Sequence, residues 1–136
     1  MQKIVTNRCY GGFGLSKEAY VRYAELKNIT LYPEVEDFGL TTYWTVPKDQ
    51  RPKKIDWQEA TMEERRANNK AHEQSQLYGR DIARDDPILV KVVEELGEDA
   101  NGKYAKLRIT EIPDGIEWEI EEYDGMEHVA EKHQTW

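Results

Sequence analysis

A glycine-rich run near the start of the chain combines residue types that can bind anions, stack on rings and act as nucleophiles. The run reads Cys9-Tyr10-Gly11-Gly12-Phe13-Gly14-Leu15-Ser16. It follows a short apolar segment and precedes a stretch of helical spacing that begins at Lys17. Glycines let a backbone approach a ligand closely, and the free N–H groups of a first helical turn attract an anion. A loop that binds a phosphate or a nucleotide is therefore one hypothesis for this run.

Neighbouring side chains could complete such a site. Ser16 could add its hydroxyl, and the rings of Tyr10 and Phe13 could stack on a base. Arginines suit phosphate because they offer bidentate contacts. The candidate ligand-binding residues are Arg8, Tyr10, Gly11, Gly12, Phe13, Gly14, Ser16, Lys17, Arg80 and Arg84.

A structural interpretation of the same residues stays open. The glycine spacing matches neither the dinucleotide fingerprint G-x-G-x-x-G nor the Walker A loop. The run could be a tight turn between a strand and a helix, with Phe13 in the core. The two distant arginines could pair with acids that are adjacent to them in the sequence, which are Asp81, Asp85 and Asp86.

The single cysteine and the histidines give weaker signals. Cys9 lies beside Arg8 and upstream of a helix N-terminus, where a thiol can become a nucleophile. No histidine or acid is near it in the sequence, so we favour a buried structural cysteine. The spacing of His128 and His133 does not place both on one face of a helix or a strand. We therefore predict no metal site, no cofactor and no catalytic residue.

Acidic and aromatic side chains follow further patterns. Glutamates alternate with apolar residues over 116–121, which is typical of a solvated sheet face rather than of paired catalytic carboxylates. The chain has eight Tyr and four Trp against two Phe, which favours rings with a polar group, as at ligand pockets and interfaces. Trp44, Trp57 and Trp136 fall in segments with few core residues, so some of them could line a pocket or a subunit contact.

Length and charge limit the possible functions. A chain of 136 residues with 38% apolar residues is expected to form one domain with a modest core. The net charge of −8 disfavours nucleic acid and anionic membranes as partners. One cysteine excludes a disulfide framework within the chain. No stretch has the apolar core of a signal peptide or the length of a membrane span, so we expect a cytoplasmic protein.

A strand and a helix are predicted on either side of the glycine run. Residues 3–8 have the composition of a short strand. Ser16 is a suitable N-cap for a helix that ends at Asn28. The next predicted strand covers residues 29–32, immediately before Pro33.

The middle of the chain, about 33–79, has fewer signals. Residues 41–46 have strand composition, and a charged loop with two prolines follows them. Thr61 and Glu64 form a capping-box pattern at the start of an almost wholly polar helix. We interpret this segment as a variable polar insert in a single domain that spans the whole chain.

The C-terminal part predicts a helix, a strand and a hairpin. Asp86-Pro87 begins a helix with an apolar stripe, and Gly97 ends it. A strand follows at 105–112. The next strand continues through a two-residue turn, Asp124-Gly125, into the last one. This turn would place Ile120 opposite Val129 and Glu121 opposite His128.

These elements together predict an α+β fold. The expected arrangement is one mostly antiparallel sheet covered by two helices. The sheet would combine the N-terminal βα unit with a C-terminal β-meander.

Several motifs occur together near the two ends of the chain. They are Asn7-Arg8 with the glycine-rich run, Asp86-Pro87, Val93-Glu94-Glu95-Leu96-Gly97, Ile112-Pro113-Asp114-Gly115, Trp118-Glu119-Ile120 and Tyr123-Asp124-Gly125. In this combination the chain resembles a family of small proteins encoded by bacteriophages and prophages. The resemblance implies a viral origin and a place in the cytoplasm of an infected bacterium.

Small accessory phage proteins include antagonists of host defence. One class sequesters nucleotide immune signals, such as cyclic ADP-ribose derivatives and cyclic oligonucleotides. By this analogy we expect a homo-oligomeric, non-enzymatic protein that binds a small phosphorylated, nucleotide-like ligand. An inhibitor that binds a host protein through the acidic strand and the polar helix is the second hypothesis. A small nucleotide-processing enzyme, with Cys9 or an acid in its mechanism, is the third.

Overall fold

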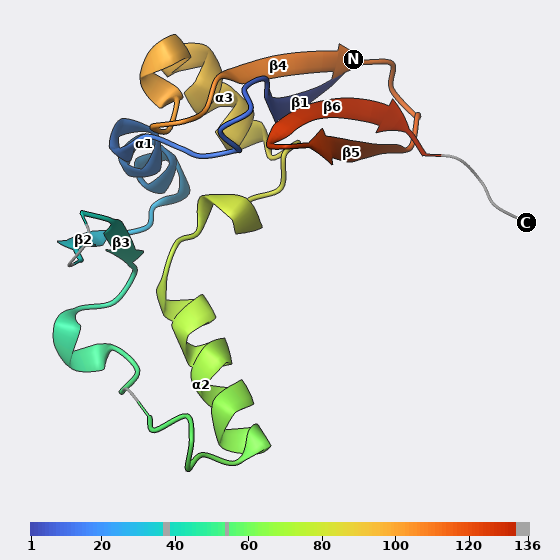
Figure 1. Ribbon diagram of the computed structural model, residues 1–136. Helices are drawn as coiled ribbons and strands as arrows, with labels where there is room; N and C mark the ends of the chain where they lie inside the picture. The colour runs from blue at the N-terminus through green and yellow to red at the C-terminus, as the bar shows by residue number, and fades with distance from the viewer. Residues whose placement is uncertain (37–38, 54, 133–136) are drawn as a thin grey trace, which may run out of the picture. The chain divides into compact units, whose positions relative to one another are not determined.

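The chain forms two compact units. The computed structural model describes residues 1–36, 39–53 and 55–132. The first unit comprises Met1–Lys27 and Gly79–Trp136, and the second comprises Asn28–Tyr78 (Figure 1). The second unit nearly coincides with the insert expected at about 33–79. The expectation of a single domain with an insert stays a prediction.

The first unit holds most of the regular structure. Its elements are β1 (Gln2–Asn7), α1 (Lys17–Lys27), the 3₁₀ turn η2 (Gly79–Asp81), α3 (Pro87–Leu96), the 3₁₀ turn η3 (Gly97–Ala100), β4 (Leu107–Ile112), β5 (Trp118–Tyr123) and β6 (Met126–Glu131). Strand β1 pairs antiparallel with β4, and β5 pairs antiparallel with β6. Helix α3 packs against β1 and β4 and also against α1.

The core of the first unit lies where α3 meets β1 and β4. Ile4, Val5, Leu89 and Val92 are completely buried. The buried residues of α3 recur at helical spacing, so one face of the helix is directed into the core. Strand β1 is buried throughout residues 4–7 and includes two polar side chains. Those polar groups must find hydrogen-bond partners inside the protein.

The helices of this unit begin and end where the capping rules predict. The Ser16 hydroxyl accepts a hydrogen bond from the Ala19 amide at 3.1 Å. The chain leaves α1 through Asn28, which has a left-handed φ of 58°. Asp86 caps α3, and Gly97 ends it with a φ of 57°. Local sequence therefore sets the ends of both helices, as expected.

The hairpin of β5 and β6 has the expected register. Both of the predicted cross-strand pairs form, including Glu121 with His128. The turn residues Asp124 and Gly125 have φ values of 51° and 91°, as a type I′ turn requires. Nε2 of His128 lies 3.0 Å from the Glu121 carboxylate, which confirms a polar pair on the exposed face.

The α+β class is confirmed, but the strands of the described residues form three two-stranded sheets instead of one sheet with a meander. The second edge of β1 is already bonded. The Val5 amide donates to the Arg84 carbonyl at 2.8 Å, and the Asn7 amide donates to the Glu127 carboxylate at 2.9 Å. A loop and a side chain thus occupy the positions that a further strand would need.

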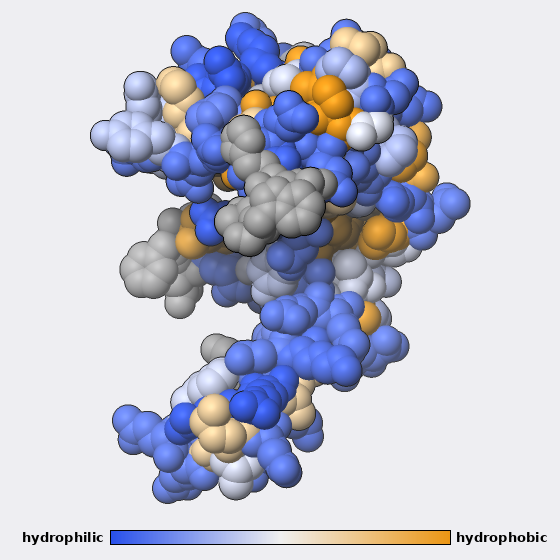
Figure 2. Space-filling model, turned by 90° about the vertical axis from the view of Figure 1, so that its right-hand side faces the viewer, coloured by the Kyte–Doolittle hydropathy of each residue, from blue (hydrophilic) through white to orange (hydrophobic). Residues whose placement is uncertain are grey.

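The second unit is small and largely polar. Its elements are β2 (Tyr32–Val35), β3 (Thr41–Trp44), the 3₁₀ turn η1 (Lys48–Gln50) and α2 (Met62–Ser75). The Thr61 hydroxyl accepts from the Glu64 amide, so the predicted start of α2 is confirmed. The face of the molecule that Figure 2 shows is mostly hydrophilic, in keeping with a charged fraction of 34%.

The prediction of a strand over residues 29–32 was wrong, because the strand lies at Tyr32–Val35. Pro33 was taken as the end of the strand, but it pairs with Tyr43 within β2 and β3. An edge strand tolerates proline because one side of its backbone needs no ladder hydrogen bond.

Strand β3 is also joined to the segment that follows α2. The Thr45 amide donates to the Ser75 carbonyl, and the Leu77 amide donates to the Tyr43 carbonyl, both at 2.8 Å. These bonds tie the C-terminal end of α2 to β3. The ring of Trp44, at the end of β3, is thereby placed beside the last turns of the helix.

The Asp86 carboxyl makes stability depend on pH. Partial burial alone would raise its pKa, but hydrogen bonds from the Tyr23 hydroxyl and the Ile88 amide, both at 2.8 Å, together with Lys27 at 3.4 Å, lower the pKa below its ordinary value. A carboxyl with a lowered pKa stabilises the fold above its unfolded pKa, about 4, and loses that contribution as the pH falls through the folded pKa.

We therefore expect Asp86→Asn to weaken the loss of unfolding free energy that the protein shows as the pH falls below about 4. At pH 7 the variant should lose about 1 kcal/mol, because asparagine still caps the helix but lacks the charge. Urea unfolding at neutral pH and in acid measures the effect, and Glu94→Gln on the exposed face of α3 is the control. An unchanged loss of stability in acid would show that Asp86 is not the group responsible.

Candidate functional site

The glycine-rich run lies between β1 and α1, where its backbone packs tightly against two other loops. A methyl group on Gly11 would stand 2.1 Å from the Tyr104 carbonyl oxygen, and one on Gly125 would stand 2.4 Å from the Tyr10 carbonyl oxygen. The Gly102 amide donates to the Gly14 carbonyl at 3.0 Å. Gly11 of the run, together with Gly102 and Gly125 of the neighbouring loops, therefore permits close packing between loops.

Ser16 uses its polar groups within the protein. Its amide donates to the Ala100 carbonyl, and its hydroxyl donates to the Asp99 carbonyl while accepting from Ala19. The hydroxyl thus serves as the cap of α1 and as a link to η3. A ligand at this helix end would compete with those contacts.

Arg84 is the centre of a buried network. Its guanidinium bonds both oxygens of the Glu127 carboxylate, at 2.5 and 2.8 Å, and lies 3.5 Å from the centre of the Phe13 ring. The sequence offered adjacent acids as its alternative partners, but the partner in the fold is an acid from β6. Arg84 and Phe13 are therefore brought together, with the arginine charge already neutralised.

The other basic candidates are more accessible. Arg8 donates to the Glu127 carbonyl at 3.2 Å and is otherwise exposed. Lys17 and Arg80 are exposed, and neither has an ion pair among the described residues. The structure thus joins Arg8, Phe13 and Arg84 around one glutamate. Phosphate binding by the run stays a prediction.

The structure describes only some of the remaining reactive candidates. Cys9 is a half-buried free thiol. His133 falls outside the described residues, as does Trp136. Among the residues that the structure describes, no three His, Cys, Asp or Glu side chains are grouped so that they could hold a metal ion.

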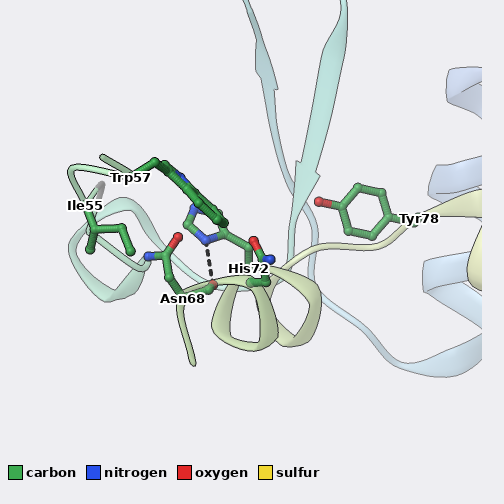
Figure 3. Close-up of a pocket in the computed structure, with 6 residues that line it drawn as sticks. Ile55, Trp57, Asn68, His72 and Tyr78 are labelled. Atoms are coloured by element: carbon green, nitrogen blue, oxygen red, sulfur yellow. Dashed lines mark hydrogen bonds between the residues drawn. The ribbon is translucent and has the colours of Figure 1, made fainter. Parts of the chain in front are cut away.

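A pocket of about 420 Å³ lies in the second unit (Figure 3). Its lining comes from the segment before α2, from α2 itself and from Tyr78, which follows α2 in the chain. The lining residues are Ile55, Trp57, Asn68, Asn69, His72 and Tyr78. Of these, only Trp57 was among the tryptophans that the sequence suggested for a pocket.

Hydrogen bonds fix which polar atoms the pocket can offer. Nδ1 of His72 lies 2.9 Å from the Asn68 carbonyl oxygen (Figure 3). A carbonyl only accepts, so Nδ1 carries the proton and Nε2 of the neutral ring is left as an acceptor. The Asn68 side-chain amide donates to the Lys53 carbonyl at 2.9 Å, which leaves its oxygen as a second acceptor. Asn69 adds an exposed amide.

Arginines lie beside two of the rings in this unit. The guanidinium of Arg65 is 5.7 Å from the Trp57 ring and bonds the Trp57 carbonyl. Arg51 lies 4.7 Å from the buried Trp44 ring, which is 6.1 Å from the His72 ring. The lining of the pocket is therefore supported by cation–π contacts.

The side of the pocket formed by α2 was not foreseen. The available signal was the spacing of Asn68 and His72, which places them one turn apart on the same face of a helix. On a wholly polar helix this spacing does not stand out, because most positions could form a polar pair. Trp57, which lines the same pocket as that face, lies in the loop before α2.

Comparisons of the chain with protein-family models, with curated proteins and with solved structures found no match. Among the described residues, none of the helices combines the length and the apolar character needed to cross a membrane.

Proposed function

We propose that this protein binds a small nucleotide-like ligand without altering it, and that the base of the ligand occupies the pocket of the second unit. The observation that carries the proposal is the combination of an exposed tryptophan, an imidazole and two side-chain amides in one pocket of about 420 Å³. Aromatic faces with a few polar groups are the usual composition of small-ligand sites. Trp57 supplies the stacking face.

The polar atoms favour a base with an amino group. The Asn68 oxygen and Nε2 of His72 are acceptors, and the Asn69 amide can both donate and accept. Two acceptors against one mixed group suit a ligand edge that carries N–H donors, as adenine and guanine do. Bases without an exocyclic amine should bind more weakly.

Charge also favours this unit as the place where a phosphorylated ligand binds. Residues 28–78 contain seven Lys and Arg against nine Asp and Glu, whereas the rest of the chain contains twelve against eighteen. An anion therefore meets less repulsion near the pocket than at the glycine-rich run. The guanidinium of Arg65, 5.7 Å from the Trp57 ring, is a group that could meet a phosphate there.

The resemblance to phage-encoded proteins extends the proposal to a biological role. In an infected bacterium, a binder of this kind would sequester a nucleotide immune signal, of the cyclic ADP-ribose or cyclic oligonucleotide class. The pocket supports this role because its tryptophan ring and polar side chains suit a nucleobase. The phage origin and the cytoplasmic location are parts of the same proposal.

A thermal-shift series tests the ligand class. We expect AMP, GMP, ADP-ribose and cyclic dinucleotides to raise Tm, with UMP weaker and ribose 5-phosphate without effect. A ligand at 100 times its Kd adds about 2.7 kcal/mol, which corresponds to roughly 3–6 °C for a chain of this size. No shift with any nucleotide would contradict the proposal and favour the host-protein inhibitor. Recovery of a chemically altered ligand would favour the enzyme.

Variants locate the site. Trp57→Ala should abolish the shift with little loss of stability, because the side chain is 46% exposed. Asn68→Ala should weaken binding about tenfold, the usual effect of losing one good hydrogen bond. The matched control is Lys17→Glu with Arg80→Glu, which reverses exposed charges near the glycine-rich run. If this control abolishes binding and Trp57→Ala does not, the run is the site.

A further inference from the structure

Three tyrosines of the first unit are strongly exposed: two lie in loops, and Tyr123 is the last residue of β5, beside the hairpin turn. Tyr10, Tyr104 and Tyr123 have exposed fractions of 61%, 64% and 77%. They belong to the glycine-rich run, to the turn before β4 and to the hairpin between β5 and β6. Exposed tyrosines on loops are typical of recognition surfaces, because each supplies a large contact area with few rotatable bonds.

The three loops lie side by side. The close approach of Gly11 to Tyr104, and of Gly125 to Tyr10, places the glycine-rich run between the turn and the hairpin tip. The three tyrosines therefore come from adjacent backbones. We name the exposed region made of residues 8–12, 103–106 and 122–125 the tyrosine surface.

One buried side chain holds all three loops. The side-chain amide nitrogen of Asn7 donates to the Cys9 carbonyl at 2.7 Å and to the Gly125 carbonyl at 2.8 Å. The side-chain oxygen of Asn7 accepts from the Lys106 amide at 2.9 Å. Because Asn7 is completely buried, these bonds exchange little with water. The tyrosines are thus held on a preorganised frame, which reduces the entropy lost on binding.

Charges of opposite sign flank the tyrosines. Lys103 and Lys106 are exposed on the turn side, and Nζ of Lys103 lies 5.3 Å from the Tyr104 ring. Glu122 and Asp124 are exposed on the hairpin side. A surface that is basic at one end and acidic at the other is complementary to itself under a two-fold rotation.

We propose that the tyrosine surface is a two-fold interface between two copies of this chain. The axis passes near Tyr10, so that the turn of one copy meets the hairpin tip of the other. Tyrosine rings fill the centre, and the lysine and carboxylate groups pair at the rim. This interface does not involve the pocket of the second unit, so its test is independent of ligand binding.

Sedimentation velocity of the full chain, from about 1 to about 200 µM, tests the proposal. We expect a concentration-dependent dimer. Replacing all three tyrosines by serine should raise the dimer Kd at least about a hundredfold, whereas the control Tyr32→Ser in β2 should leave it unchanged. Far-UV circular dichroism and Tm show that the variants fold. A chain that stays monomeric, or a dimer that survives the triple substitution, overturns the proposal.

A charge swap tests the two-fold geometry. Lys103→Glu and Glu122→Lys should each weaken the dimer, because every contact occurs twice and like charges then meet. The double variant should recover most of the affinity. Glu122 is preferred to Asp124 for the reversal because Asp124 has a positive φ, where lysine would strain the turn. A double variant as weak as the singles overturns the two-fold arrangement.

Discussion

Glu127→Ala should lower the free energy of unfolding by about 3–5 kcal/mol, the cost of leaving a buried ion without its partner. The Glu127 side chain is only 7% exposed, and that of Arg84 is 16% exposed. Without the carboxylate, the backbone amide of Asn7 loses its acceptor, and the Arg84 guanidinium keeps, among the described residues, only the Val5 carbonyl oxygen at 3.3 Å. Urea unfolding followed by far-UV circular dichroism measures the change.

A double-mutant cycle separates the interaction between Arg84 and Glu127 from the packing lost when either side chain is replaced. Arg84→Met combined with Glu127→Leu removes both charges, and its cost should be clearly less than the sum of the two single changes. The matched control is Lys3 with Glu94, an ion pair at 3.3 Å in which both side chains are more than 40% exposed. Removing Glu94 should cost no more than about 1 kcal/mol. Equal effects at Glu127 and Glu94 would contradict the burial of the network.

Gly11→Ala should be the most damaging change within the glycine-rich run, with a cost of about 3 kcal/mol or more. A methyl group there would overlap the backbone carbonyl of Tyr104, so the two loops must separate. Gly12→Ala meets no atom within 4 Å, but its φ of 91° disfavours a side chain. That change should cost about 1–2 kcal/mol. Thermal and urea unfolding measure both.

Gly14→Ala completes this series as the control. Its nearest contact would be 3.9 Å from the Gly102 Cα, and its φ is not positive. A cost below about 1 kcal/mol is therefore expected. The order Gly11, Gly12, Gly14 follows from the loop packing at Gly11 and from the positive φ at Gly12. If all three variants keep their stability and lose ligand binding together, the run is an anion loop instead.

Only part of the candidate site could be predicted. The aromatic composition pointed to Trp57, because a large ring in a segment with few core residues needs a partner. Asn68 and His72 could not be predicted as pocket residues, since their role depends on how the loop with Trp57 folds beside α2. Arg84 was listed as a candidate ligand-binding residue because its partner in the fold, Glu127, lies 43 residues away in the sequence. The expected pairing of β6 with β5 formed, but it gives no indication that β6 also contacts Arg84.

Interactions between residues that are close in the sequence explain the local features of this protein. Ser16, Asp86 and Thr61 cap their helices, and Asp124-Gly125 sets the hairpin register. Each of these features depends on contacts within a few residues and on backbone preferences, so it can be predicted without knowledge of the fold. The α+β class follows from the same signals.

The way in which these elements contact one another became apparent in the tertiary structure. It ended the sheet at β1, because Arg84 and Glu127 bond the edge that another strand would use. It packed Gly11 of the glycine-rich run against Tyr104 and brought together the backbones that carry three exposed tyrosines. These outcomes depend on pairs of residues that are distant along the chain, and local preferences carry no information about such pairs.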